Sequence, residues 1–443
     1  MSVNTLLYLN LIIPFLFILT LGLSFFLGRP LSEKNLQRVW TITSVLIAVL
    51  GLMQFTYFFI NTIPAQSVHL PAWFSFEQYH FETVFLIDYL SVTYGALSAV
   101  ILSVIIKFSF NYLYKEAGYF RFFFLIGLLY FGLILVCYAG TLDILFIGWE
   151  LVGTTSVLLI AFFHQNISSV RNSIKALIGY RLCDMGILAA SAWAHHHIGS
   201  TEFVTMSQHV YELSHEGHFY IYIVIGLFII WASLAKSAQL PFSAWLPKAM
   251  EGPTPSSAVF YGALSIHLGP YLLLRAAPFL EQHWSLTLVI GVIGGITAVY
   301  ATLVGRTRSD AKTMLAYATM TQLGLIFVEI SLGFYKLALV HMVANASLRS
   351  WQFLRASSLI QDFQDNPLVY QDTVIKRQFS IEQLFPLKWR MKLYIHALNE
   401  FHLDYITGFF LKYFFFYPIE QFKKFDRWLM RMNNSIVSFL LRK

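Results

Sequence analysis

The chain has 443 residues, of which 57% are hydrophobic and only 12% are charged, and its mean hydropathy is +0.63. Soluble domains carry about a quarter charged residues, so this composition excludes a soluble protein and indicates a polytopic membrane protein. The net charge of +7 comes from basic residues clustered in short loops, which is typical of membrane topology and excludes a nucleic-acid partner.

Apolar segments long enough to cross a membrane follow one another along the first 360 residues. At about 20 residues per crossing, we expect an all-α fold with about eleven transmembrane helices in residues 1–360 and an amphipathic tail in residues 361–443. The first segment has no basic region before it, so it is predicted to be a retained helix rather than a cleaved signal. The expected spans are 5–27, 39–61, 83–106, 121–139, 142–163, 174–194, 219–247 (broken), 256–279, 285–305, 313–333 and 337–360.

The distribution of lysine and arginine predicts the orientation of these spans. The first loop contains Arg29, Lys34 and Arg38, and every second loop after it is also basic. The two long alternate loops, 62–82 and 195–218, contain neither lysine nor arginine. Because basic loops stay on the cytoplasmic side, we predict that the N-terminus lies outside and that the tail is cytoplasmic.

Residues 232–257, ASLAKSAQLPFSAWLPKAMEGPTPSS, place a lysine beside a helix break in the seventh span. Pro241 lacks a backbone donor and clashes with the preceding turn, so the helix should be interrupted close to Lys236. A lysine and freed carbonyls inside a membrane are tolerated only where they face protein or a water-filled cavity, which indicates an ion pathway. The alternative is a lysine whose ammonium group snorkels to the membrane surface.

Other ionisable residues also lie inside the predicted spans. Arg181 and Asp184 are three residues apart on one helical face, so a structural ion pair and a proton relay are both open interpretations. Burial disfavours the charged forms of Glu150 and Lys236, whereas proximity of the two favours them, so a change in their separation can load or release a proton. The remaining ionisable residues of interest are His267, Arg275, Glu329, His341 and Arg349.

Two polar regions outside the spans have a functional and a simpler interpretation. The loop 195–218 is rich in histidine and glutamate, which suits metal binding or pH sensing, but it shows no fixed ligand spacing and we expect a solvated interfacial loop. The tail contains an amphipathic pattern that suits a membrane surface or a partner subunit, and the short apolar run 405–417 is expected to be interfacial or covered by a partner. The loop residues are His195, His196, His197, His209, His215, His218, Glu202, Glu212 and Glu216, and the tail pattern sets Phe422, Phe425, Leu429, Met432 and Ile436 opposite Lys423, Lys424, Arg427 and Arg431.

Five segments resemble the proton-conducting antiporter-type subunits shared by respiratory complex I and Mrp antiporters. They are LFIGWELVGTTSVLLI, YRLCDMG, AKSAQLPFSAWLPKAMEGPTP, RSDAKTMLAYATMTQLG and HMVANASLRS, and together the similarity covers about residues 85–360. The resemblance implies a fold of inverted repeats, in which Glu150 and Lys236 correspond to the family's coupling glutamate and broken-helix lysine. It also implies family motif positions for Arg181, Asp184, Lys312 and His341.

Three positions depart from the family's pattern. The family usually has histidine where this chain has Tyr261, and a histidine and a lysine where it has Asn345 and Arg349. Arginine does not release its proton in a protein and tyrosine titrates at about pH 10, so neither serves as a relay at neutral pH. The family's later spans, with a second broken helix, are missing from this sequence, so we expect a truncated second repeat and one ion-handling half built on Glu150 and Lys236.

The shortened form and the segment FYGALSIHLGPYLLLR are similar to the DabB family, the membrane subunits of DAB-type inorganic carbon transporters. This resemblance implies a transporter subunit of the bacterial inner membrane, not an enzyme, which uses H⁺ or Na⁺ translocation to drive bicarbonate accumulation. It implies a DabA-like, zinc-containing soluble partner, with a higher oligomer of that heterodimer as a further option. Cys137 and Cys183 each lie in a predicted span and the chain has no Cys/His set for zinc, so we expect no cofactor here and assign any CO2 hydration to the partner.

Two other functions stay open. The first is a cation/proton antiporter subunit or a proton-pumping subunit of a respiratory NADH dehydrogenase. The second is a non-conducting scaffold that anchors a soluble enzyme, although the presence of Glu150 and Lys236 argues against it.

Overall fold

The structure is a computed structural model that describes residues 2–76, 79–215, 219–356 and 386–440, with short gaps between residues 404 and 416. The chain divides into two compact units, Met1–Phe379 and Ser380–Lys443. The first unit contains all of the predicted spans, and the second contains most of the predicted tail.

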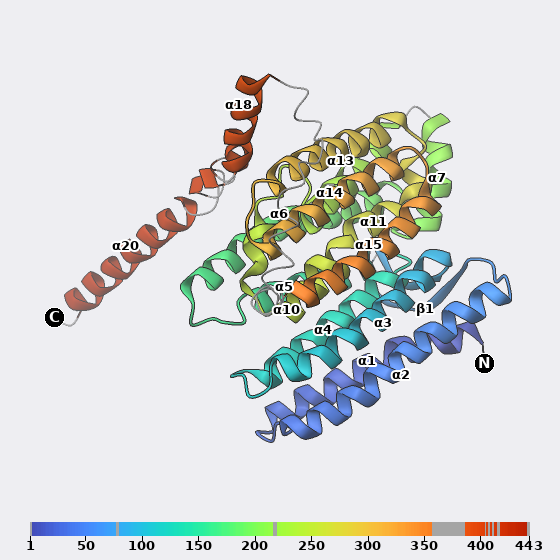
Figure 1. Cartoon of the computed structure of the whole chain (residues 1–443), viewed down its shortest axis with the longest axis horizontal. Coiled ribbons are helices and arrows are strands. Elements are labelled where there is room, and N and C mark those ends of the chain that lie inside the picture. Colours follow the sequence, from blue (N-terminus) through green and yellow to red (C-terminus); the bar gives the residue numbers. More distant parts are fainter. Residues whose placement is uncertain are drawn as a thin grey trace, which may run out of the picture. The chain divides into compact units, whose positions relative to one another are not determined.

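Four N-terminal helices of the first unit pack against one another (Figure 1). Buried polar side chains link three of them: the Asn10 amide donates to Gln54 Oε1 at 2.6 Å, and the Tyr138 hydroxyl donates to the same oxygen at 2.7 Å. Unpaired polar groups are costly in an apolar interior, so this small network fixes how the helices meet. The helices are α1 (Val3–Phe26), α2 (Glu33–Ile60), α3 (Tyr89–Tyr112) and α4 (Tyr119–Tyr138).

The residues between α2 and α3, predicted to be a loop, form a β-hairpin. Strand β1 (Gln66–Phe76) pairs antiparallel with β2 (Tyr79–Ile87), and the register shifts between Leu70 and Phe74, around Pro71. Proline has no donor for the ladder, which explains the irregularity there. The third span consequently begins at Tyr89, where Asp88 and Ser91 form a capping box, rather than at residue 83.

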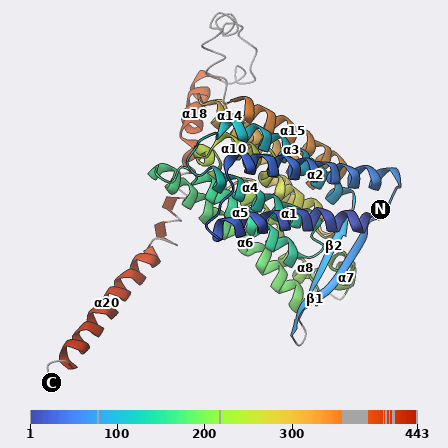
Figure 2. The same cartoon turned by 90° about the horizontal axis from the view of Figure 1, so that it is seen from below.

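The next part of the chain contains α5 (Leu142–Ile160), α6 (Ile167–His197), α7 (Phe203–His215) and α8 (Phe219–Lys236). Figure 2 shows the hairpin and α7 at the same end of this unit. Helix α6 is longer than predicted, so His195–His197 form its last turn, and His195 is only 7% exposed. The expectation of a solvated loop is therefore wrong for His195. His209 lies on α7, whereas the side chains of His215 and His218 are outside the described residues.

The seventh and eighth spans are irregular. Helix α8 ends at Lys236, and the chain becomes helical again only in α9 (Trp245–Lys248), followed by the 3-10 turn η1 (Ala249–Glu251). The predicted break is thus confirmed. The eighth span, which is completely buried between Thr254 and Arg275, consists of α10 (Thr254–Ser257), the π-helix η2 (Ala258–Ala263), the 3-10 turn η3 (Ser265–His267), α11 (Leu268–Arg275) and α12 (Ala277–Leu280).

The last three helices of the unit are α13 (Trp284–Gly305), α14 (Ala311–Ser331) and α15 (Tyr335–Ala356). Glycines let two helix pairs approach to backbone contact. A Cβ on Gly148 of α5 would lie 2.5 Å from the Gly132 carbonyl of α4, and one on Gly324 would lie 2.5 Å from the Gly294 carbonyl across α13 and α14. Small residues at such crossings allow close packing of helices in membranes.

In the part of the chain that the structure describes, nine helical segments are long and apolar enough to cross a membrane. The helices α6 and α15 are also long but fall outside this set, and both carry ionisable residues in their middle, including Arg181, Asp184 and Arg349. Adding α6 and α15 to these nine segments gives eleven, the number of spans that the sequence predicts. A mostly helical, polytopic membrane fold with a broken seventh helix is therefore confirmed.

The second unit contains α18 (Leu387–Leu398), η5 (Glu400–His402) and α20 (Tyr417–Leu440). As the sequence predicts, α20 is amphipathic: Phe422 and Phe425 are exposed, and Lys424 reaches Glu420 one turn away at 3.9 Å. The side chains of Arg431, Met432 and Ile436 lie outside the described residues, as does much of the run 405–417.

Candidate functional site

The broken end of α8 places Lys236 inside the protein. The segment after it turns back on itself: the Ala238 amide donates to the Ala235 carbonyl at 3.1 Å, and the Gln239 amide donates to the Leu234 carbonyl at 2.8 Å. Ala238 adopts a φ of 49°, in the left-handed region that ends helices. The helix therefore stops at Lys236 itself, several residues before Pro241, and local bonds satisfy carbonyls that the break would leave free.

Lys236 is 1% exposed, which excludes an ammonium group that snorkels to the membrane surface. Its Nζ donates to the Trp149 carbonyl at 3.2 Å and lies 4.5 Å from the centre of the Tyr180 ring and 5.4 Å from that of the Trp149 ring. Aromatic faces attract cations. Among the described residues, Lys236 forms no ion pair, so the buried ammonium is held by a carbonyl and two rings rather than by a carboxylate.

Gly153 leaves room for this ammonium. A Cβ at Gly153, one turn after Trp149 on α5, would lie 2.5 Å from Lys236 Nζ. Even alanine at this position would displace the head of the lysine. The position of the ammonium group therefore depends on glycine at residue 153.

Trp149 connects Lys236 with a buried acid. Its indole Nε1 donates to Asp184 Oδ1 at 2.6 Å, and Asp184 is 2% exposed. The other carboxylate oxygen, Oδ2, has no hydrogen-bond partner in the described part of the chain. A buried carboxylate with an unsatisfied oxygen is costly, so this oxygen is available to accept a proton or a water molecule.

Glu150 points to a different partner. Its carboxylate forms an ion pair with Arg181 of α6, and Arg181 also donates to Thr154 Oγ1 at 3.2 Å. The interpretation of Arg181 and Asp184 as an ion pair is therefore wrong, because Arg181 reaches across to α5 instead of along its own helix. The pair is partly exposed, with side-chain exposures of 39% for Arg181 and 21% for Glu150. Among the described residues, no hydrogen bond or ion pair joins Glu150 to Lys236. A Cβ on Gly153 would lie 2.5 Å from Lys236 Nζ and 3.9 Å from Arg181 Nη2, so Arg181, the partner of Glu150, comes close to the lysine.

His267 lies in the irregular eighth span and is completely buried. Its Nε2 is 3.1 Å from the amide nitrogen of Asn345 on α15, which can donate to the neutral ring. Asn345, one of the three residues that depart from the family's pattern, thus contacts the predicted site residue His267. Tyr261, in the π-helix before it, is buried, and its hydroxyl has no hydrogen-bond partner.

His341 lies one turn before Asn345 and is held between two side chains of α14. Its Nδ1 is 2.8 Å from Glu329 Oε1, and its Nε2 is 2.8 Å from Gln322 Oε1. The ring donates to both oxygens only when it is protonated, and rotation of the Gln322 amide lets a neutral ring accept instead. The structure thus brings Glu329 and His341 together.

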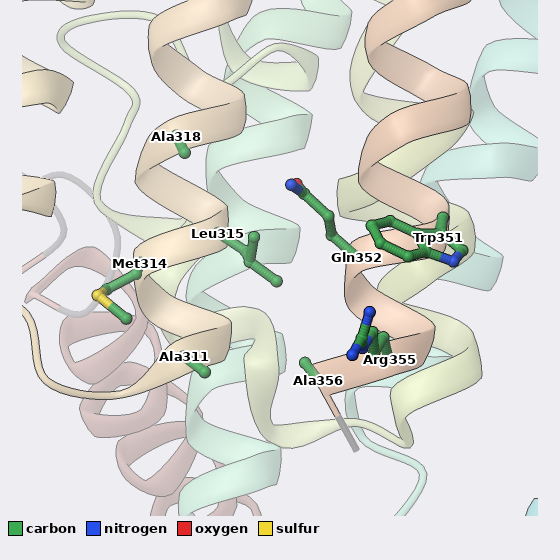
Figure 3. Close-up of a pocket in the computed structure, with 8 residues that line it drawn as sticks. All are labelled: Ala311, Met314, Leu315, Ala318, Trp351, Gln352, Arg355 and Ala356. Atoms are coloured by element: carbon green, nitrogen blue, oxygen red, sulfur yellow. The ribbon is translucent and has the colours of Figure 1, made fainter. Parts of the chain in front are cut away.

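Arg349 and Lys312 lie apart from these contacts. Arg349, one turn after Asn345, donates to Gln352 Oε1 at 2.6 Å. Figure 3 shows Gln352 extending from α15 toward α14, where the two helices line a groove of about 300 Å³. Lys312, half-buried in the first turn of α14, makes no contact with the other predicted site residues.

Sequence reasoning missed Trp149, Tyr180, Gly153 and Gln322 as parts of the site. Trp149 directly precedes Glu150, so an aromatic residue beside a buried acid was the available signal. Tyr180 and Gly153 become meaningful only when α5, α6 and α8 are assembled, because their role depends on distances between helices.

Comparisons with known proteins show the family to which the chain belongs. Residues 139–416 match the family described as NADH:quinone oxidoreductase/Mrp antiporter, transmembrane. The chain therefore belongs to this family of antiporter-type membrane subunits. Similar proteins include NADH-ubiquinone oxidoreductase chain 5 of Podospora anserina, with 31% identity over 92% of this chain and 60% of that protein, and that of Rhizopus stolonifer, with 32% identity over 87% of this chain and 57% of that protein.

Solved structures share the fold. The Mrp complex from Dietzia sp. DQ12-45-1b contains a chain that matches with a TM-score of 0.67 and 24% identity, over 80% of this chain and 37% of that chain. An archaeal membrane-bound sulfane sulfur reductase matches with a TM-score of 0.71 and 17% identity, over 91% of this chain and 86% of that chain. The chain spans about 60% of the length of the curated relatives it matches.

Proposed function

We propose that this chain is the ion-translocating membrane subunit of a multisubunit complex, with Lys236 as the group that carries the proton. The observation that carries the proposal is the position of Lys236: it is 1% exposed, stands at the broken end of α8 and has no carboxylate partner among the residues that the structure describes. An ammonium group held only by a carbonyl and aromatic rings is not part of an ion pair. It can therefore release its proton without leaving an uncompensated carboxylate in the protein interior. The nearby Asp184 and Glu150 supply groups that can exchange it.

The relatives support an antiporter or respiratory role more directly than inorganic carbon transport. The curated relatives are named as chain 5 of NADH-ubiquinone oxidoreductase, and the structural neighbours come from an Mrp complex and a respiratory complex. We therefore place the respiratory or antiporter-type subunit, kept as the alternative in the sequence analysis, ahead of the DabB-type function. Other membrane subunits would be its partners.

The DabB-type function remains as a second candidate because of the replaced positions on α15. Asn345 binds His267 and Arg349 binds Gln352, so two positions that are usually titratable in the family hold side chains that do not exchange protons at neutral pH. A subunit with one ion-handling half suits a transporter driven by a single coupling step. Under this proposal the chain is not itself an enzyme, lies in a bacterial inner membrane with its N-terminus outside, and associates with a DabA-like zinc-containing subunit.

The test of ion translocation uses the tagged chain purified with its associated subunits and reconstituted in proteoliposomes that contain a pH-sensitive dye. We expect Lys236→Ala to abolish uncoupler-sensitive proton movement. Lys107→Ala, which removes an exposed lysine at the end of α3, should leave it unchanged. Near-normal proton movement by Lys236→Ala would refute the proposal and favour the scaffold function.

Mass spectrometry of the purified complex distinguishes the two candidates. Subunits of a quinone oxidoreductase or antiporter would support the first candidate. A zinc-containing, carbonic-anhydrase-like subunit would support the second, and cells expressing this chain without that subunit should then take up no labelled inorganic carbon.

A further inference from the structure

A second polar cluster lies at the end of α5 that faces the hairpin. The Asp143 carboxylate, in the first turn of α5, accepts hydrogen bonds from Ser191 at 2.5 Å, from Thr201 at 2.6 Å and from His195 Nε2 at 3.0 Å. The His195 side chain is 4% exposed and that of Asp143 is 18% exposed. Two segments distant from Asp143 in sequence, helix α6 and the loop before α7, thus converge on one carboxylate.

This cluster continues to the surface through Glu202. Glu202 follows Thr201 directly and accepts from Thr205 at 2.6 Å and from Ser67 of the hairpin at 3.2 Å. His69 Nε2 lies 3.9 Å from its carboxylate, and side-chain exposure falls from 56% at His69 to 12% at Glu202. Glu202 thus lies beside the exposed His69, and its chain neighbour Thr201 donates to the Asp143 carboxylate.

The cluster is also aligned with the Lys236 site. Asp143 and Glu150 are seven residues apart on α5, and Ser191 and Asp184 are seven residues apart on α6, so each pair lies on one face of its helix. Two helical turns separate the two levels by about 10 Å. One or two water molecules can bridge such a gap where polar groups line it.

We propose that Asp143, His195 and Glu202 form the proton-exchange port that connects the Lys236 site with the solution at the hairpin end of the bundle. This inference rests on the proposed function. Protons enter or leave at Glu202 and His69 and pass between Glu202, His195 and Asp143 by exchange of O–H and N–H hydrogens. The hydroxyls of Thr201 and Ser191 accept one proton as they donate another, and no other bond forms or breaks.

The elements around the port also carry other titratable groups, namely His196 and His197 on α6, Glu82 on β2 and His69 on β1. Of these, His69 reaches the port, with its Nε2 3.9 Å from the Glu202 carboxylate. His195 also packs against the Phe81 ring of β2, with 5.0 Å between ring centres. His195 and Glu202 are buried, whereas His69 and Glu82 are exposed, so the two buried residues are the positions at which the port is tested.

His195→Gln separates this role from a structural one. A glutamine amide can still donate to Asp143, so the tie between α5 and α6 is kept, but it cannot take up a proton. His196→Gln is the matched control because His196 is the exposed neighbour on the same turn. Glu202→Gln is the second test variant, and its amide can accept from one of the Ser67 and Thr205 hydroxyls and donate to the other. All variants are purified as the complex, checked by thermal unfolding and reconstituted in proteoliposomes.

Proton flux is measured at constant pH on the other side while the pH at the hairpin face is varied. We expect His195→Gln and Glu202→Gln to lower the flux by roughly 100-fold, the lower end of what a positioned proton-transfer group contributes, and to remove its dependence on the varied pH. Wild-type flux and pH dependence in a folded His195→Gln or Glu202→Gln complex would overturn the port, as would an equal loss in His196→Gln. Unaltered flux in Lys236→Ala would instead count against the proposed function.

Discussion

Lys236 and Asp184 are joined through a single residue, Trp149, whose carbonyl accepts from the ammonium at 3.2 Å while its indole donates to the carboxylate at 2.6 Å. The cation and the acid are therefore neighbours without being a direct pair. A direct buried pair holds both charges firmly, because separating them leaves each uncompensated. The intervening tryptophan gives a weaker coupling, which suits a site that must change its charge during turnover.

We expect Trp149→Phe to impair translocation because it removes the only hydrogen bond that the described residues make to Asp184, while keeping an aromatic face over Lys236. Leaving this buried carboxylate without a donor should lower the free energy of unfolding by about 1–3 kcal/mol. The control is Trp40→Phe, since Trp40 is buried but its indole nitrogen donates no hydrogen bond to any described residue. Thermal unfolding and proton flux of both complexes provide the measurement, and equal effects in the two variants would contradict the role of the indole.

Gly153→Ala should displace the Lys236 ammonium, because the new Cβ would lie 2.5 Å from Nζ. The head of a lysine moves easily, so the complex should remain folded, while a displacement of about 1 Å lowers flux on the order of 100-fold. Gly295→Ala is the matched control in another span, where the nearest atom to an added Cβ is 3.9 Å away. Normal flux in Gly153→Ala would mean that the position of the ammonium is unimportant.

Glu150→Gln removes the negative charge that holds Arg181. Because the pair is partly exposed, the free energy of unfolding should change by less than about 1 kcal/mol, yet flux should fall on the order of 100-fold if Glu150 exchanges the proton. The double variant Glu150→Gln, Arg181→Gln tests whether the arginine acts through this pair. If Arg181→Gln alone loses flux and the double variant loses no more than either single one, the two residues act as a unit.

Truncation after Ala356, the last described residue of α15, should leave the first unit inserted but release a partner subunit. The reason is the separate C-terminal unit with its amphipathic helix α20, whose exposed aromatic residues require a covering surface. Protease protection of the membrane fraction and co-purification report the two outcomes. A partner that still co-purifies with the truncated chain must dock on the first unit.

The positions of the spans could be predicted closely from hydropathy because a membrane helix needs a continuous apolar run of sufficient length. The break near Lys236 was also predictable, since Pro241 and the lysine both disfavour an intact helix there. The hairpin at residues 66–87 was missed because the long loop was judged only by its lack of lysine and arginine. Its many aromatic and β-branched residues are the pattern that favours strands.

The pairing of charges could not be predicted from spacing within one helix. Arg181 and Asp184 have the right separation for an ion pair, but Glu150 on α5 and Trp149 beside it offer them different partners. In the same way, His195 was assigned to a solvated loop because the sequence around it gives no sign of its contact with Asp143, which lies 52 positions earlier. Contacts between helices, rather than along them, decide which ionisable residues meet.

The glycine contacts between α4 and α5 and between α13 and α14 have a mechanical consequence. Helices that touch through their backbones cannot slide without steric overlap, so each pair should move as a rigid body. Any rearrangement that opens Lys236 first to one side and then to the other must be absorbed elsewhere. The backbone can act as a hinge at the unwound residues 237–244 and at the π-helical turn Ala258–Ala263. Lys236 directly precedes the first of these hinges, so it would lie at a hinge rather than within either rigid helix pair.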